Sequence, residues 1–280
     1  MGETMQIRRC EENGAVYITY QNIDKTGIVT HGFSTRVGGI SEDYLGSMNL
    51  SYTRGDKKEN VDENYRRIAK AIGFKPENMV FSEQTHTTNI RKVTKEDRGK
   101  GFEKQRDYKD VDGLITDEKG LVLSTFYADC VPLFFVDRVH QAIGLTHSGW
   151  RGTVGKIGKK TVEMMTKEYG TNPRDIVAAI GPSICVNCYE VSEDVACEFQ
   201  KVFTKIQVKK FLKEGKQPFK YQLDLWEANR IIMEEAGILS ENIAMPGICT
   251  CCNPEFLYSH RASNGKRGNL GAFLTLKNKI

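Results

Sequence analysis

The sequence predicts a protein of the α/β (α+β) class whose sheets mix parallel and antiparallel strands, and three observations support this. The apolar runs LVLSTF (121–126) and VPLFFV (131–136) are typical of strands that are buried on both faces. Helical spacing of apolar residues recurs between groups of strands, as in 57–73. The strands come in pairs and do not alternate one by one with helices, so a purely parallel βαβ series is not expected.

The first third of the chain is predicted to contain strands and one helix. AVYITYQ (15–21) and GIVTHGFSTR (27–36) have the apolar pattern of strands. KKENVDENYRRIAKAIG (57–73) has helical spacing and ends on Gly73, which is a common helix-terminating signal. Strand character returns in NMVFSEQTHTTNIRKV (78–93).

The middle of the chain is predicted to supply the central strands. After a loop of mixed charge, 112–137 and 141–147 are expected to give three or four strands separated by turn residues. A helix is predicted over 154–169, because its apolar residues share one helical face. DIVAAIGP (175–182) is expected to be a further buried strand.

Two helices and the last strands are predicted for the C-terminal third. SEDVACEFQKVF begins with a serine and then acidic residues, as a capped helix does, and 224–236 is a second helix that a glycine closes. The last strands are expected in ENIAMPGICT (241–250), FLYSH (256–260) and GAFLTLK (271–277).

Length and composition limit the classes of function. The 280 residues contain no Pro-, Gly- or Ser-rich linker, so a single domain over 1–280 is expected. The net charge is only +4 and basic residues are mixed with acidic ones, which argues against a nucleic-acid-binding face. No apolar run approaches about 18 residues and the N-terminus lacks the apolar core of a signal peptide, so we expect no membrane association and a cytoplasmic location.

Eight cysteines in a cytoplasmic chain suggest thiols, metal ligands or a nucleophile before disulfides. Cys185 and Cys188 form a Cys-x-x-Cys pair, and Cys249, Cys251 and Cys252 cluster in ICTCCNPEF. Together they could supply a structural zinc site, but the second cluster is not taken as a Cys-x-x-Cys pair, and the two groups do not have the spacing of a zinc ribbon. Buried, separate small thiols are therefore the favoured interpretation.

Three segments combine polar residues with strand character. His147 follows the strand QAIGLT at a glycine-rich turn, which is a common place for a site, although such a histidine can also just hydrogen-bond the turn. Gln84 and His86 lie in FSEQTHTTN, and Asp129 and Cys130 interrupt an apolar strand in FYADCVPLFF. A buried carboxylate is costly unless it is paired or functional. Two histidines and a cysteine are suitable zinc ligands, but their separations form no recognised local motif.

Seven separated motifs resemble those of one family: HGFSTRVGGIS with GSMNLS, SEQTHT, DGLIT, ADCVPLFF, THSGWRGT, IGPSICVNCYEV and CTCCNPEFLYSHR. They are similar to the YfiH/YlmD family, also called the laccase-domain or polyphenol oxidase family. The resemblance implies a four-layer α/β/β/α fold and a zinc-dependent purine nucleoside phosphorylase that also deaminates adenosine and cleaves methylthioadenosine. It further implies one Zn²⁺ held by His86, Cys130 and His147.

The implied reaction assigns roles to other residues. Phosphate requires cationic donors, and the guanidinium groups of Arg36, Arg151 and Arg261 are candidates because their geometry matches phosphate. Asn49 and Gln84 could hydrogen-bond the ribose or the base. Asp129 could move a proton or orient a ligand, while zinc would activate a water for deamination. The expected partners are purine nucleosides and phosphate, with the chain a monomer or a weak homo-oligomer.

Three alternatives remain at this stage. A copper oxidase is one, but five histidines without a His-x-His pair are too few for a four-copper site, leaving at most a single Cu²⁺ on His86, Cys130 and His147. A hydrolase or deamidase with Cys130 as nucleophile and a histidine as base is the second. A non-catalytic binding module is the third, and it leaves Asp129 unexplained.

Overall fold

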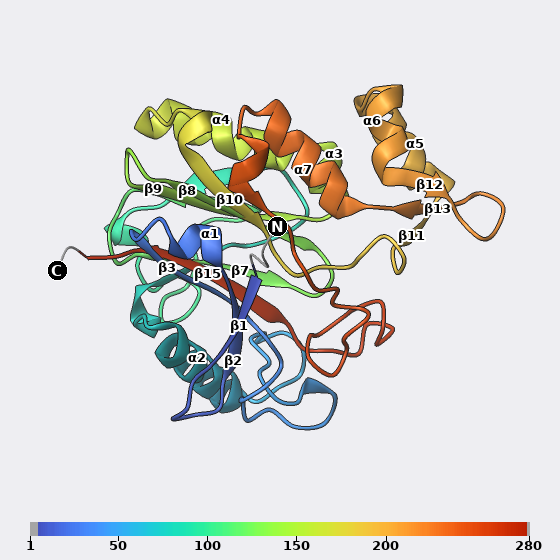
Figure 1. Cartoon of the computed structure of the whole chain (residues 1–280). Coiled ribbons are helices and arrows are strands. Elements are labelled where there is room, and N and C mark those ends of the chain that lie inside the picture. The colour runs from blue at the N-terminus through green and yellow to red at the C-terminus, as the bar shows by residue number, and fades with distance from the viewer. Residues whose placement is uncertain (1–4, 279–280) are drawn as a thin grey trace.

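The computed structural model describes residues 5–278 and has four layers, with two six-stranded sheets face to face and helices on both outer surfaces (Figure 1). In spatial order the first sheet contains β1 (Met5–Arg9), β2 (Val16–Tyr20), β3 (Val29–Ser34), β15 (Leu270–Leu276), β7 (Val122–Tyr127) and β4 (Met79–Phe81). The second contains β14 (Ile243–Ala244), β10 (Ile176–Ile180), β8 (Val131–Asp137), β9 (Ala142–Ser148), β6 (Gly113–Thr116) and β5 (Ile90–Lys92). The predicted fold class is confirmed.

Both sheets are mixed, as predicted. The pairs β4–β7, β5–β6 and β10–β14 are parallel. The other strand pairs of the two sheets are antiparallel. Both sheets therefore combine directly paired neighbours in the chain, such as β8 and β9, with strands far apart in the sequence, such as β3 and β15.

Alternation along each central strand explains why its sequence is apolar throughout. In β8, Phe134 and Val136 belong to the core between the sheets, whereas Leu133 and Phe135 pack beneath the outer helices. In β15, Phe273 likewise packs on the outer side of the first sheet. Both faces of these strands are therefore buried, which is what the runs at 121–126 and 131–136 predicted.

Helices cover the two outer faces. Helix α2 (Lys58–Ile72) packs on the first sheet and ends at Gly73 with a φ of 96°, a conformation that favours glycine. Helices α4 (Ile157–Tyr169) and α7 (Leu225–Glu235) cover the second sheet (Figure 1). The side chain of Asp224 accepts a hydrogen bond from the backbone of Glu227, as expected for the start of α7.

The helix expected over 154–169 is present as α4 but begins three residues later, at Ile157. α3 (Trp150–Val154) is followed by Gly155 and by Lys156, whose left-handed φ of 55° interrupts the helix before α4 begins. The strand expected at 256–260 was wrong: this segment forms turns, and its apolar Leu257 and Tyr258 are buried without joining a sheet. Apolar character alone did not distinguish a buried turn from a strand.

A small third sheet, separate from the two six-stranded sheets, was not predicted. It contains β11 (Glu190–Ser192), β13 (Lys220–Leu223) and β12 (Leu212–Glu214), with α5 (Glu193–Val202) and α6 (Lys205–Phe211) beside it at the right of Figure 1. α5 begins where expected, but the side chain of Ser192 bonds to Asp194 and makes no capping bond.

The remaining elements are short. They are α1 (Gln21–Asp24) and the 3-10 turns η1 (Asp43–Leu45), η2 (Pro76–Asn78), η3 (Lys95–Asp97), η4 (Pro173–Asp175) and η5 (Ser240–Asn242). No helix within 5–278 is long and apolar enough to span a membrane. The single domain expected over 1–280 stays a prediction.

Candidate metal centre and cavity

Strand register brings distant residues to one end of the second sheet. β8 and β9 are antiparallel with Pro132 opposite His147, so the start of β8 lies beside the end of β9. β6 begins opposite Thr146, which places the preceding residue, Asp112, next to His147. Cys130 immediately precedes β8 on the short connection by which the chain passes from β7 in the first sheet.

The expectation that Asp129 and Cys130 lie inside a strand was wrong. They belong to the connection 128–130 between the two sheets, and Asp129 has a φ of 91°, which is strained for a residue with a side chain. The crossing needs a sharp change of direction, because β7 and β8 lie in different layers.

His86, Cys130 and His147 meet as one donor group. Their ligand atoms all lie within 4.8 Å of one another, and Cys130 Sγ is 3.9 Å from His86 Nε2. The two imidazole rings are 5.0 Å apart between centroids and nearly perpendicular. The structure thus brings together the three residues that the resemblance implied as metal ligands.

Asp112 holds the two histidines in place, and sequence reasoning missed it. Its carboxylate accepts a hydrogen bond from His147 Nδ1 at 2.8 Å. It also accepts bonds from the backbone N–H groups of Thr85, His86 and Thr87 at 3.2, 3.1 and 2.8 Å. The signal was a carboxylate directly before the strand in DGLIT, a motif used only for the resemblance.

Charges inside this group favour the thiolate form of Cys130. Burial alone would raise the pKa of Cys130, but the charge of His147 and hydrogen bonds from both imidazoles lower it to about 6. Burial alone would lower the pKa of His147, but Cys130 and Asp112 raise it. A thiolate at neutral pH is the form that binds a metal or acts as a nucleophile.

The donor set fits a divalent metal ion. A thiolate and two imidazoles are borderline-soft ligands, and three protein ligands with an open fourth position are typical of catalytic zinc. The bond from His147 Nδ1 to Asp112 fixes the ring so that Nε2 is left for the metal, as a supporting carboxylate does in many zinc sites. These residues could therefore hold one ion.

Asp112→Asn should weaken metal binding about 10- to 100-fold, the usual effect of losing a supporting carboxylate. The amide would turn an NH₂ group toward one of the N–H donors that now surround the carboxylate. Asp110→Asn is the matched control, because Asp110 lies in the same region and its carboxylate bonds the Thr85 hydroxyl. Competitive metal titration measures the effect, and equal affinities in the two variants would contradict the role given to Asp112.

Gly149, at the start of α3, lies against His86 and Cys130 of the donor group. A Cβ at this position would be 2.8 Å from His86 Cδ2 and 3.2 Å from Cys130 Sγ. We expect Gly149→Ala to displace His86 and to lower metal affinity about tenfold, in line with other changes around metal ligands. Gly152→Ala is the control, because its Cβ would find its nearest atom at 3.5 Å. Unchanged metal affinity in Gly149→Ala would contradict this prediction and show that metal binding tolerates a displaced His86.

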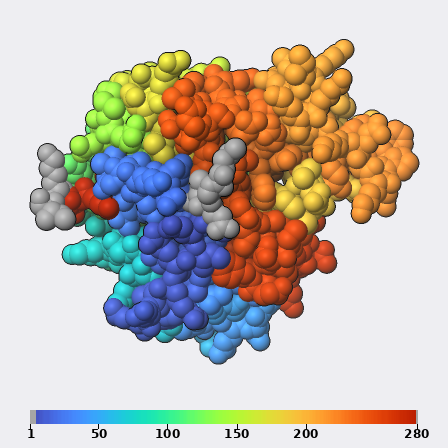
Figure 2. Space-filling view, in the orientation of Figure 1, coloured from blue at the N-terminus to red at the C-terminus, as the bar shows by residue number. Residues whose placement is uncertain are grey.

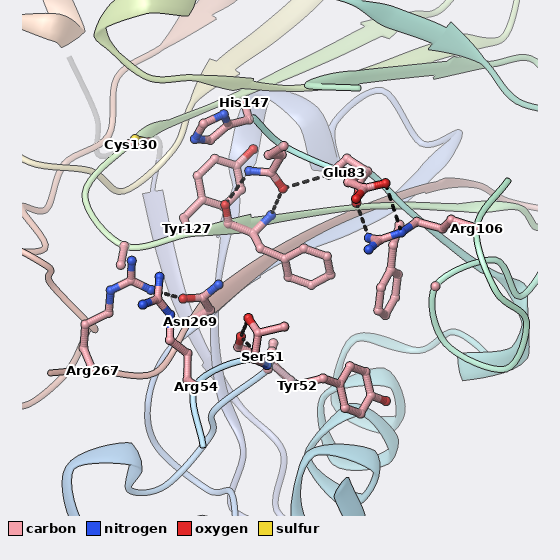
Figure 3. Close-up of a pocket in the computed structure, with 18 of the residues that line it drawn as sticks. Ser51, Tyr52, Arg54, Glu83, Arg106, Tyr127, Cys130, His147, Arg267 and Asn269 are labelled. Carbon is pink, nitrogen blue, oxygen red and sulfur yellow. Dashed lines mark hydrogen bonds and ion pairs between the residues drawn. The ribbon is translucent and has the colours of Figure 1, made fainter. Parts of the chain in front are cut away.

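The donor group opens into a cavity of about 340 Å³ that is lined by the ends of β4, β7 and β9 and by the loops beside them (Figure 3). His86, Cys130 and His147 line one part of it, and Gln84 and Tyr127 lie nearby. The other labelled polar lining residues are Ser51, Tyr52, Arg54, Glu83, Arg106, Arg267 and Asn269. A cavity of this size suits a small molecule with apolar and polar parts.

Two neighbouring arginines give this cavity a positive end. Arg54 and Arg267 approach each other in Figure 3, and the Nε atoms of both are buried without a hydrogen-bond partner. Burial and the charge of Arg54 lower the pKa of Arg267 to about 10. No carboxylate within 5–278 forms an ion pair with either side chain, whereas Arg106 lies 3.9 Å from Glu83. Two adjacent guanidinium groups without a carboxylate partner are suited to binding an anion.

The arginines proposed from the sequence do not line this cavity. Arg36 donates to the carbonyls of Gly46 and Pro254, and Arg261 donates to those of Cys188 and Glu190. Arg151 is exposed, with its guanidinium 4.3 Å from the Trp150 ring centroid. Their phosphate-binding role stays a prediction without support from this geometry.

The two amides are engaged by the protein itself. Asn49 is fully buried and bonds Ser51, Asp56 and the backbone of Asn269. Gln84 lines the cavity, but its amide bonds both backbone groups of Phe126, at 2.7 Å each. Gln84 therefore forms part of the cavity wall, and Asn49 supports the lining residue Asn269 from behind it. Contact of either amide with ribose or base stays a prediction.

Asp129 anchors two loops. Its carboxylate accepts hydrogen bonds from the Thr250 hydroxyl and from the backbone N–H of Arg261, both at 2.7 Å. These bonds account for a nearly buried carboxylate and favour the orienting role over proton transfer. Because Asp129 precedes Cys130, the two loops also help to position the thiolate.

The fold and the donor group define a class of four-layer α/β/β/α proteins with a His, Cys, His group beside a cavity. The chain belongs to the YfiH/YlmD family: the family model described as "Multi-copper polyphenol oxidoreductase laccase" matches residues 30–277. Purine nucleoside phosphorylase YlmD of Bacillus subtilis is 40% identical over 89% of both chains. The crystal structure of YlmD from Geobacillus stearothermophilus superposes with a TM-score of 0.89 at 33% identity, covering 99% of this chain and 100% of that one.

A more distant relative, purine nucleoside phosphorylase LACC1 of mouse, is 34% identical over 88% of this chain and 55% of its own length. The description of the family model mentions several coppers, but the histidines do not provide for them. His31 bonds the backbone of Tyr20, His140 bonds Asp137, and His260 lies on the C-terminal loop. Only two of the five histidines reach the donor group.

Proposed function

We propose that this chain is a zinc-dependent purine nucleoside phosphorylase that cleaves adenosine, inosine and methylthioadenosine and also deaminates adenosine. One observation carries the proposal: the His86, Cys130, His147 group and the Arg54–Arg267 pair line the same cavity. The first group suits a metal, and the second suits a phosphate dianion. The two relatives named purine nucleoside phosphorylase agree with this chemistry.

Arg54 and Arg267 would bind and orient phosphate. A phosphate oxygen attacks the anomeric carbon of the ribose, the bond from that carbon to the purine nitrogen breaks, and the bonding electron pair leaves with the purine. The products are ribose 1-phosphate and a free base that takes up a proton. Two guanidinium groups would hold the nucleophile close to the sugar and neutralise its charge.

His86, Cys130 and His147 would hold the zinc ion at the other part of the cavity. When bound, the ion would supply Lewis-acid chemistry at its open position. Asp112 keeps His147 in the tautomer that leaves Nε2 for the ion. Adenosine deamination would use water and no phosphate, so it should be independent of the arginine pair.

Steady-state assays of the zinc-loaded enzyme with and without phosphate test the proposal. Inosine cleavage should require phosphate and yield ribose 1-phosphate, while conversion of adenosine to inosine should proceed without it. Release of free ribose at the same rate in both conditions would contradict phosphorolysis. Zinc as the native metal in place of copper, the cytoplasmic location and the oligomeric state stay predictions.

One geometric feature favours a second candidate, a cysteine hydrolase. Asp112, His147 and Cys130 follow one another as orienting acid, base and thiol, as in many thiol enzymes. Such an enzyme would need neither metal nor phosphate. Full activity after exhaustive chelation, together with inactivation by a thiol-alkylating reagent, would favour this candidate over the phosphorylase.

A further inference from the structure

Outside the cavity, two pairs of cysteines meet at the surface. Cys185 and Cys188 lie on the loop between β10 and β11, and Cys249 and Cys252 lie on the loop after β14. Their four sulfur atoms all lie within 4.8 Å of one another. In Figure 2 the yellow segment with the first pair lies against the orange-red segment with the second. We call these four residues the four-cysteine group.

Both pairs have Cys-x-x-Cys spacing. In the sequence the spacing of the second pair is obscured by a third cysteine, Cys251, which the structure places outside the group. Separate buried thiols were the wrong expectation, because only Cys249 is buried. The backbone N–H of Cys188 donates to the carbonyl of Cys185 at 3.0 Å, and this tight turn points both side chains the same way. Two Cys-x-x-Cys pairs that face each other are typical of structural zinc sites.

The sulfur separations are close to those of a tetrahedral thiolate site. Zinc–sulfur bonds of about 2.3 Å give sulfur–sulfur edges of about 3.8 Å in a tetrahedron. Sγ of Cys252 is 3.9 Å from that of Cys185 and 3.3 Å from that of Cys188. A disulfide would require about 2.0 Å, so the structure shows these cysteines as free thiols arranged around one point.

The surroundings suit the negative charge of bound thiolates. Backbone N–H groups of Cys185 and Cys252 point at Cys249 Sγ, at 3.2 and 3.4 Å. The Arg261 guanidinium donates to the carbonyl of Cys188 at 3.0 Å, which places a positive charge beside the first pair. N–H donors and a nearby cation are the supporting interactions expected around a thiolate-bound metal.

We propose that the four-cysteine group binds one Zn²⁺ ion as a second, structural metal site. Four cysteines leave no open position, so the ion would have no direct part in the reaction. The ion would link the loops that carry the two cysteine pairs, and both loops hydrogen-bond to Asp129, the residue before Cys130. Thr250, between the second pair, donates to the Asp129 carboxylate, and the N–H of Ile184, beside the first pair, donates to the Asp129 carbonyl at 3.0 Å.

Metal analysis of the full chain tests the proposal. Wild-type protein should contain about two zinc ions per chain, and Cys252→Ser should lose about one of them. Its melting temperature should fall by roughly 5–10 °C, as expected for a lost tight ligand. Cys251→Ser is the matched control, since Cys251 lies on the same loop outside the group. It should keep both ions.

A second experiment isolates the four-cysteine group from the cavity. Cys130→Ala loaded with Co²⁺ should show the intense visible absorption of tetrahedral thiolate cobalt, and Cys130→Ala/Cys252→Ser should not. The wild type could instead contain one zinc ion that is lost in Cys130→Ala and kept in Cys252→Ser. That result would overturn the four-cysteine site and leave the proposed function intact. Fewer than eight titratable thiols in the unfolded, chelator-treated protein would show a disulfide and also overturn it.

Discussion

Cys130→Ala is expected to purify with the cavity metal missing and with turnover reduced about 10³-fold or more, on the order of 4 kcal/mol of transition-state stabilisation. Cys130 supplies the one anionic ligand of the His86, Cys130, His147 group, and two imidazoles alone bind zinc weakly. Phosphorolysis and deamination should both be lost. Metal content and nucleoside turnover, measured on the same preparation, check this result.

Cys197→Ala is the control for the loss of a cysteine, because Cys197 lies on α5 outside both groups of candidate metal ligands. It should keep its metal and its activity. If the Cys130→Ala protein keeps full turnover without cavity metal, the ion has no part in the reaction. A protein that keeps the ion but loses all turnover would favour Cys130 as a nucleophile.

Arg267→Ala should lower kcat/KM for phosphate about 100-fold, which is close to 3 kcal/mol and matches the loss of charge-assisted hydrogen bonds. Deamination of adenosine should be nearly unchanged. Thermal stability should stay the same or rise, because Arg54 lies beside Arg267 and the repulsion between them disappears. A reduced phosphate response without a loss of stability would separate a binding role from a folding role.

The matched variants are Arg151→Ala and Arg36→Ala, which remove the arginines that sequence motifs suggested. Arg151 is exposed, so its removal should change phosphate kinetics little. Arg36 supports the backbone of Gly46 and Pro254, so its removal should lower the melting temperature instead. If kcat/KM for phosphate falls further in Arg151→Ala than in Arg267→Ala, phosphate binds at the arginine suggested by the sequence motif and not at Arg267.

Much of the fold could be predicted because the spacing of apolar residues along the sequence indicates which face of a helix or strand is buried. The helix at 57–73 and the strands at 131–136 and 271–277 follow from local apolar patterns, and the structure confirms them within a few residues. The break at Lys156 and the buried turns at 256–260 depend on packing against other layers. The third sheet pairs short polar strands that have no apolar signal.

The site was predictable only where a residue belonged to a motif. His86, Cys130 and His147 came from family motifs, whereas Asp112 needed the register of β6 and β9 to show its contact with His147. Arg267 lies on a loop, and its position beside the cavity depends on chain segments more than 100 residues apart. Long-range placement of this kind leaves no trace in local spacing.

The most direct test is turnover of inosine by the zinc-loaded enzyme in phosphate labelled with oxygen-18. If phosphate is the nucleophile at the anomeric carbon, ribose 1-phosphate should carry all of the phosphate label, including the oxygen that bridges phosphorus and the sugar. Mass spectrometry and phosphorus NMR of the product measure this. Free ribose with its new oxygen taken from water, formed at a rate independent of phosphate, would contradict the assignment of this cavity to phosphorolysis.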